Sequence, residues 1–143
     1  MIFLISRSSV AQSGGALQIP AVELIQPPEL AHIVRTAGEV KPVILQVGSH
    51  VLYEEAHIPG SEYVGAAGND EGLNALHKRA AKMQRTQPVV LYCGCCPWSK
   101  CPNIGAAYQL MHSLGFSHLK VLYIASNFGT DWVDKGYPTV KGK

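Results

Sequence analysis

The chain has 143 residues and a formal net charge of +2, with 47% hydrophobic and 15% charged residues. This length fits one domain with its own hydrophobic core, and the low charged fraction is typical of a compact globule rather than a disordered chain. The 12 lysines and arginines form no basic stripe, which argues against a nucleic-acid partner. No apolar run approaches the roughly 20 residues that cross a bilayer, so no membrane segment is expected.

The first 18 residues differ in character from the rest. They contain an apolar patch from Ile2 to Ile5 and small residues over 11–16, like the end of a secretion signal. Such a signal has a positively charged start and an apolar stretch of about 7 to 15 residues, whereas this patch is shorter and Arg7 follows it. We therefore expect 1–18 to be a flexible segment, with a signal remnant as the alternative, and 19–143 to form the domain. The sequence leaves the compartment open.

The first half of the domain alternates apolar runs of strand length with a segment of helical periodicity. A weak strand at 17–25 contains Pro20, which favours an edge position. A helix begins at the proline pair 27–28 and ends near Gly38. A strand over 43–47 then leads to the turn "HIPGS" at 57–61 and a second weak strand at 62–66.

The second half repeats the alternation. A helix covers 69–84 with Asn69 or Asp70 as its cap, and another runs from a cap at Asn103 to Gly115. Strands are expected at 89–93 and 120–125. The strongest runs are apolar on both parities, as in parallel strands covered by helices on both faces. The order predicts a small α/β sandwich.

The stretch "YCGCCPWSKCPN" (92–103) holds all four cysteines between the strand over 89–93 and the next helix. Cys93 therefore lies at the carboxyl end of a strand, which is where ligands bind in open α/β sheets. A helix N-terminus nearby favours an anion and lowers the pKa of a thiol, and the resulting thiolate is a nucleophile. The alternative is that Cys93 is only a small buried apolar residue.

Four segments in this order resemble the rhodanese-like sulfurtransferase family, from about residue 22 to 138. They are "VILQVGSHVLYEEAHIPGSEYV" (43–64), "VVLYC" (89–93), "LGFSHLKVLYI" (114–124) and "DWVDKGYP" (131–138). The resemblance implies a three-layer α/β sandwich with a five-stranded parallel sheet. It also implies that Cys93 carries a sulfane sulfur as a persulfide, taken from a small donor and passed to a thiol or cyanide.

By the same resemblance the loop after Cys93 binds the substrate through its backbone N–H groups. The residues assigned to this binding are Gly94, Cys95, Cys96, Trp98, Ser99 and Lys100. No cofactor and no metal are expected, and the protein is expected to be a monomer or a weak homodimer. His57 in the "HIPG" turn is interpreted as structural. Asn127 and Phe128, after the last strand, are candidates for lining the pocket.

The chain departs from the family pattern in three ways. The loop is longer than usual, Lys100 is its only cation where the family has an arginine, and Gln46-Val47-Gly48 replaces the usual Asp-x-Arg. Lys100 offers a point charge but no bidentate contact, so thiosulfate is a less obvious donor. Ser99 stands where Cys-x5-Arg phosphatases need arginine, so phosphatase activity is not expected.

Three roles stay open for the remaining cysteines. Cys96 or Cys101 could attack a Cys93 persulfide as a resolving thiol, since Cys93 and Cys96 have the Cys-x-x-Cys spacing of redox pairs. The cysteines could instead shape the loop, or bind a soft metal ion. The alternative function is accordingly a redox or non-catalytic thiol module, such as a sulfur or metal carrier or a partner-binding domain.

Overall fold

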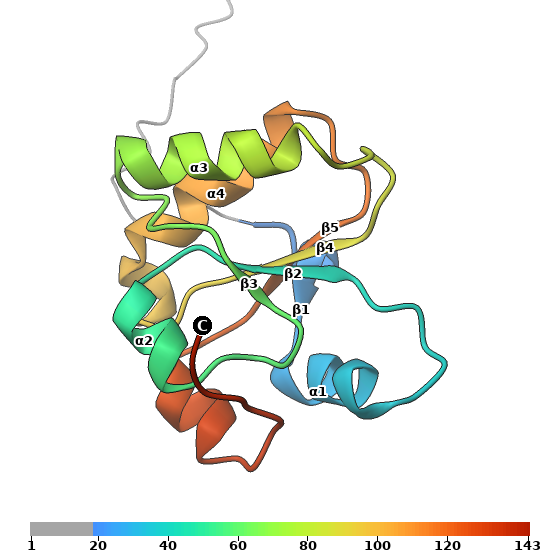
Figure 1. Ribbon diagram of the computed structural model, residues 1–143, viewed down its shortest axis with the longest axis vertical. Coiled ribbons are helices and arrows are strands. Elements are labelled where there is room, and N and C mark those ends of the chain that lie inside the picture. The colour runs from blue at the N-terminus through green and yellow to red at the C-terminus, as the bar shows by residue number, and fades with distance from the viewer. Residues whose placement is uncertain (1–18) are drawn as a thin grey trace, which may run out of the picture.

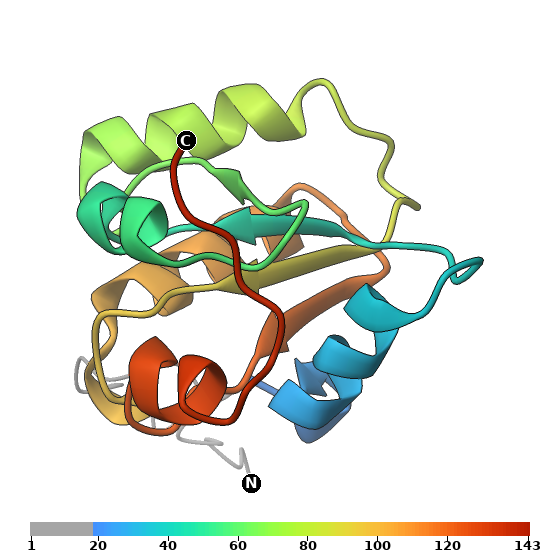
Figure 2. The same cartoon turned by 60° about the horizontal axis from the view of Figure 1, so that its bottom comes forward.

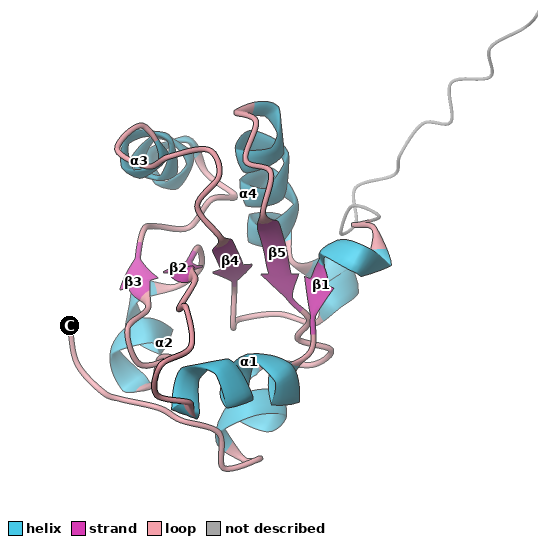
Figure 3. Cartoon of the chain, turned by 90° about the vertical axis from the view of Figure 1, so that its right-hand side faces the viewer, coloured by secondary structure: helices cyan, strands magenta, loops and turns pink. Residues whose placement is uncertain are grey.

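The computed structural model describes residues 19–143, and the segment 1–18 lies outside them. Five strands pair in parallel in the order β1-β5-β4-β2-β3, with helices on both faces (Figures 1 and 3). The strands are β1 (Leu24–Ile25), β2 (Val43–Gln46), β3 (Glu62–Tyr63), β4 (Val89–Tyr92) and β5 (Leu119–Leu122). The predicted α/β sandwich with a parallel sheet is confirmed. The first strand lies at an edge as expected, but it is limited to Leu24–Ile25, because Ala21–Glu23 form a 3-10 turn that Pro20 precedes.

The helices form two layers. In Figure 3, α3 (Asp70–Ala80) and α4 (Pro102–Ser113) cover one face, whereas α1 (Pro27–Arg35) and α2 (His50–Glu55) lie on the other. Short turns of 3-10 helix occur at Ala21–Glu23 and Trp98–Lys100, and a π-helical turn at Gly129–Val133. Within 19–143, no helix is long and apolar enough to cross a membrane.

Each face of the sheet has its own core, and β4 contributes to both. Val89 and Leu91 pack toward α3 and α4, whereas Val90 and Tyr92 pack on the opposite side. Successive side chains of a strand point to opposite faces, so the next residue, Cys93, faces the α3 and α4 layer. This alternation directs the thiol toward the start of α4.

The three predicted helices are found, but each ends earlier than predicted: α1 at Arg35 rather than near Gly38, α3 at Ala80 rather than at 84, and α4 at Ser113 rather than at Gly115. Asn69 caps α3, because its side chain accepts a hydrogen bond from the Gly72 N–H at 2.9 Å. The predicted cap of α4 was wrong. That helix starts at Pro102, with Cys101 in the cap position, so Asn103 lies inside the first turn. Proline suits this first position because its missing N–H would have no partner there.

The C-terminal segment holds the "HIPG" turn from outside the sheet (Figure 2). His57 and Val140 exchange two backbone hydrogen bonds of 2.9 Å. The His57 ring is buried, stacks on Tyr53 at 3.8 Å and contacts the Tyr53 carbonyl through Nδ1 at 2.7 Å. These contacts agree with the structural role predicted for His57.

Candidate functional site

Cys93 is the first residue after β4, because the strand ends at Tyr92, one position earlier than predicted from sequence. Its residue is 5% exposed and belongs to the core under α3 and α4. The turn before α4 places Cys101 on the same side, since Cys101 is equally buried at the N-terminus of that helix. The carboxyl end of a central strand and the start of a helix therefore meet at this thiol, as expected.

Three of the four thiols form one group. The Sγ atoms of Cys93, Cys95 and Cys101 all lie within 4.8 Å of one another, and those of Cys93 and Cys95 are 3.3 Å apart. Cys93 and Cys101 are buried, whereas Cys95 is exposed. Cys96 is outside this group, although the Cys-x-x-Cys spacing had favoured it as the partner of Cys93. Three sulfur atoms at this spacing could also hold one soft metal ion.

Asn103 is the polar side chain that contacts the thiols. Its Nδ2 donates to the Cys93 sulfur at 3.4 Å and to the Cys95 sulfur at 3.7 Å. Its Oδ1 accepts the Gly68 N–H at 2.9 Å, which fixes the orientation of the buried carboxamide. The sequence analysis noticed Asn103 only as a helix cap. Its place in the site depends on a contact between segments 35 residues apart in the chain.

The surroundings favour the anionic form of Cys93. They lower its pKa to about 5, chiefly through the hydrogen bond from the Cys101 thiol. Hydrogen bonds from the Cys95 N–H and the Asn103 amide also lower this pKa, whereas burial of the thiol raises it. The pKa of Cys101 is raised mainly by that same hydrogen bond, and the pKa of Cys95 is raised mainly by burial. The group therefore holds one thiolate, hydrogen-bonded by neighbours that keep their protons.

Gly48, after β2, leaves the space that the Cys93 sulfur occupies. A Cβ added to Gly48 would lie 2.7 Å from that sulfur, closer than van der Waals contact. The turn is fixed by Gln46, whose side chain accepts the Gly48 N–H at 3.0 Å and donates to the Ser49 carbonyl at 3.1 Å. The Gln-Val-Gly departure from the family pattern thus has a local function: it brings a residue without a side chain against the thiol.

The loop also packs against the segment after β5. The Phe128 N–H donates to the Gly94 carbonyl at 3.2 Å, and a Cβ on Gly94 would lie 2.8 Å from the Phe128 Cβ. Asn127 accepts a hydrogen bond from the Thr130 N–H at 2.8 Å. Phe128 therefore packs directly under the start of the cysteine loop, whereas the Asn127 side chain stabilises its own turn.

The other residues predicted to bind substrate lie farther along the loop. The Trp98 indole packs on the Tyr123 ring, with centroids 5.0 Å apart, and the Trp98 backbone N–H donates to the Ala125 carbonyl at 3.1 Å. Ser99 and Lys100 are exposed, and within 19–143 no hydrogen bond or ion pair joins either side chain to the thiols. The structure thus brings Cys95 to Cys93 and gives Trp98 a packing contact.

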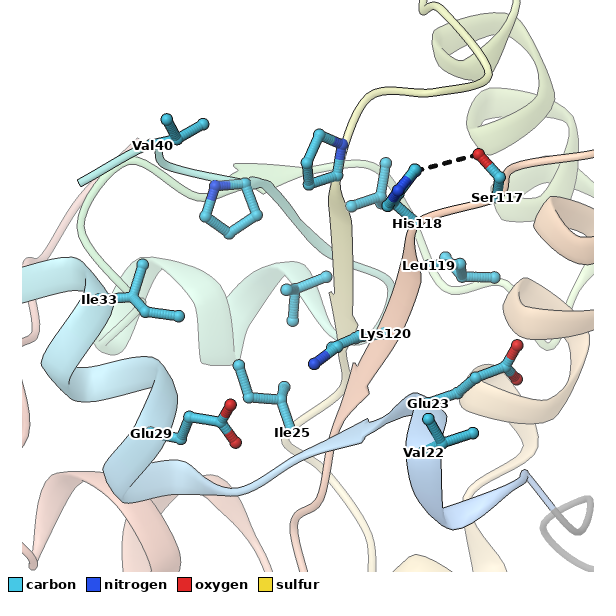
Figure 4. Close-up of a pocket in the computed structure, with 14 residues that line it drawn as sticks. Val22, Glu23, Ile25, Glu29, Ile33, Val40, Ser117, His118, Leu119 and Lys120 are labelled. Atoms are coloured by element: carbon cyan, nitrogen blue, oxygen red, sulfur yellow. Dashed lines mark hydrogen bonds between the residues drawn. The ribbon is translucent and has the colours of Figure 1, made fainter.

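A cavity of about 460 Å³ lies at the other end of the sheet (Figure 4). Pro42, Pro88 and His118, which directly precede β2, β4 and β5, help to line it. Its wall is mainly apolar, with Glu29 and Lys120 as charged members. Because these residues are at the amino ends of the strands and Cys93 follows the carboxyl end of β4, this cavity is separate from the thiol group.

Comparison with solved structures identifies the same architecture in several bacterial proteins. The Alr3790 protein from Anabaena sp. superposes with a TM-score of 0.62 at 19% identity, covering 82% of this chain and 92% of that one. The BH2092 protein from Bacillus halodurans gives 0.61 at 17% identity, covering 82% and 75%. A rhodanese-like domain protein from Staphylococcus aureus gives 0.53 at 10%, covering 85% and 99%. At these identities the likeness concerns the fold.

A comparison with curated proteins finds no match. The sequence model of the rhodanese-like domain, in contrast, matches residues 27–125, which include β2 to β5, the cysteine loop and α4. This range covers more than half of the chain and agrees with the resemblance carried by the "HIPG" turn and the strand before Cys93. The chain therefore belongs to the rhodanese-like domain family.

Proposed function

We propose that this protein is a sulfurtransferase that carries a sulfane sulfur on Cys93. The observation that supports this most directly is the thiol group itself. A thiol at the carboxyl end of β4 is hydrogen-bonded by Cys101, Asn103 and the Cys95 N–H, and together these lower its pKa to about 5. A thiol with this pKa is ionised at neutral pH and is ready to attack sulfur.

The first step is a nucleophilic displacement. The Cys93 thiolate attacks the outer sulfur of a donor R–S–SH, a new S–S bond forms, and the bond in the donor breaks. The products are Cys93–S–SH and R–S⁻, so charge and atoms balance. An acceptor thiolate or cyanide then attacks the outer sulfur and releases the Cys93 thiolate. The low pKa of Cys93 also makes it a good leaving group in this second step.

The donor that fits best is a small persulfide or polysulfide. Cys93 is 5% exposed, which disfavours a bulky donor. Within residues 19–143 no ion pair or hydrogen bond brings a lysine or arginine side chain to the thiols, so a doubly charged donor such as thiosulfate has no counter-charge of that kind. We therefore propose that a hydropersulfide, rather than thiosulfate, is the preferred sulfur donor.

The test is mass spectrometry of the reduced protein after incubation with polysulfide. Trypsin cleaves after Lys100, so Cys93, Cys95 and Cys96 fall in peptide 86–100 and Cys101 in the next. We expect one added sulfur atom, mapped by fragmentation to Cys93, and thiocyanate production on addition of cyanide. Both should be absent in Cys93→Ser. If Cys93→Ser still acquires one sulfur and produces thiocyanate at the wild-type rate, the assignment is wrong.

A second candidate is a soft-metal carrier, favoured by the 4.8 Å spacing of the three sulfur atoms. Metal analysis of protein purified under reducing conditions separates the two. Stoichiometric metal that blocks alkylation of Cys93 and sulfur loading would favour the carrier, whereas metal-free protein that loads sulfur favours the transferase.

A further inference from the structure

Cys93 and Cys95 differ in access to solvent although their sulfur atoms are neighbours. Cys93 is 5% exposed, whereas Cys95 is exposed, and their Sγ atoms are 3.3 Å apart. A small donor or cyanide needs little room, but an acceptor thiol on a peptide must bring its own backbone to the sulfur that it attacks. A sulfane sulfur on Cys93 is therefore poorly placed for such an acceptor.

We propose that Cys95 is the exit thiol of the transferase: it takes the sulfane sulfur from Cys93 and presents it to acceptor thiols of glutathione size or larger. This inference rests on the proposed function, since Cys93 must first be loaded. It differs from the expectation drawn from the Cys-x-x-Cys spacing, because the sulfur next to Cys93 belongs to Cys95 rather than to Cys96.

The exit step needs no oxidant or reductant. A persulfide is more acidic than a thiol, so the loaded site begins as Cys93–S–S⁻ beside Cys95–SH, and a proton passes from Cys95 to the outer persulfide sulfur. The Cys95 thiolate then attacks that outer sulfur, the bond to the Cys93 Sγ breaks, and the products are Cys95–S–SH and the Cys93 thiolate. One S–S bond replaces another, and the acceptor thiolate later removes the sulfur from Cys95 in the same way.

Asn103 is placed to assist this exchange as a positioning residue. Its Nδ2 lies 3.4 Å from the Cys93 sulfur and 3.7 Å from the Cys95 sulfur, so one amide can donate to either. The negative charge passes from the Cys95 sulfur to the Cys93 sulfur during the step, and the amide needs no reorientation because Gly68 fixes its oxygen at 2.9 Å. The Cys101 thiol, also within the group, is available to donate to the Cys93 thiolate as it leaves.

The experiment compares Cys95→Ser with Cys96→Ser, which removes the neighbouring thiol that lies outside the group. Each variant is loaded with polysulfide, desalted, and mixed with cyanide or with glutathione. We expect Cys95→Ser to hold its sulfur on Cys93, and its rate of transfer to glutathione, relative to the wild type, to fall about ten-fold or more below its relative rate with cyanide. The Cys96 side chain contacts Cys95, and the serine hydroxyl in Cys96→Ser can keep this contact, so the ratio of the glutathione rate to the cyanide rate should stay at the wild-type value in this variant. In wild-type protein quenched early, part of the sulfur should map to Cys95.

Several results would overturn the exit step. Transfer from Cys95→Ser to glutathione at the wild-type rate is one, and loss of that transfer in Cys96→Ser is another. A third is stoichiometric sulfide release with a Cys93–Cys95 disulfide, which would make Cys95 a resolving thiol instead. These results leave loading of Cys93 intact, so they overturn the exit step alone. Failure of wild-type Cys93 to load overturns the proposed function, and the exit step with it.

Discussion

Replacing Asn103 by alanine tests whether the carboxamide stabilises the thiolate. The variant loses a hydrogen bond to a charged, buried sulfur, worth about 1.5 to 3 kcal/mol. At about 1.4 kcal/mol for each tenfold change in ionisation, the pKa of Cys93 should rise from about 5 to between about 6 and 7. The sign follows from the contact, because Asn103 donates to the anion and its loss favours the protonated thiol.

The assay is the rate of Cys93 alkylation by iodoacetamide across pH, followed by mass spectrometry. At pH 5 half of the wild-type thiol is ionised, and the variant should react about 2 to 8 times more slowly. At pH 8 both are ionised, and the variant should react about 3 to 10 times faster, because a more basic thiolate is the better nucleophile. The two profiles should therefore cross.

Asn74→Ala, which removes an exposed amide from α3, is the matched control and should retain the wild-type profile. The thermal stability of both variants should be measured alongside, because Asn103→Ala also removes the hydrogen bond from the Gly68 N–H. A folded Asn103→Ala protein with an unchanged alkylation profile would refute the role given to the amide.

Three further predictions follow from the same geometry. Gly48→Ala should fold but lose about ten-fold or more in Cys93 alkylation rate, because its Cβ would lie 2.7 Å from the sulfur; an unchanged rate would contradict this. Gly72→Ala should lower the free energy of unfolding by about 3 kcal/mol or more, since its Cβ would lie 2.0 Å from the Ala66 carbonyl oxygen, and denaturant titration measures this. The lowered pKa of Cys93 contributes stability that is present above the unfolded-state pKa near 9 and is lost as pH falls toward about 5. The free energy of unfolding of the wild type should therefore fall relative to that of Cys93→Ser between pH 8 and pH 5. If the free energies of the two proteins change with pH in parallel, the thiolate is not stabilised by folding.

The fold was largely readable from the sequence because its signals are local. The apolar runs at 43–47 and 89–93 predicted buried parallel strands, and β2 and β4 lie there. Asn69 was correctly considered as the cap of α3. The edge strands were the weak part, since β1 and β3 have two residues each and little periodicity of their own.

The site was only partly readable, because its contacts are long-range. The place of Cys93 followed from the strand pattern, but the grouping with Cys95 and Cys101 depends on how the loop folds over the start of α4. The cap of α4, predicted at Asn103, could have been placed correctly from sequence. Proline favours the first helical position, so Pro102 indicates that Cys101 is the cap. Nothing in the sequence reveals that Gly48 approaches Cys93, since 45 positions separate them and only the β2 and β4 pairing brings them together.

The hydrogen bond between Asn103 and Gly68 links thiol chemistry to the completion of folding. One end of the amide is held by the segment before α3 and the other reaches sulfurs after β4, so its orientation is set only when these separate parts of the chain have assembled. A newly made, unfolded chain has four cysteines of ordinary acidity, which are mostly protonated and slow to react at neutral pH. Cys93 thus becomes a strong nucleophile only when the site has assembled, so we expect the unfolded chain to react more slowly with oxidants at neutral pH than the folded protein does.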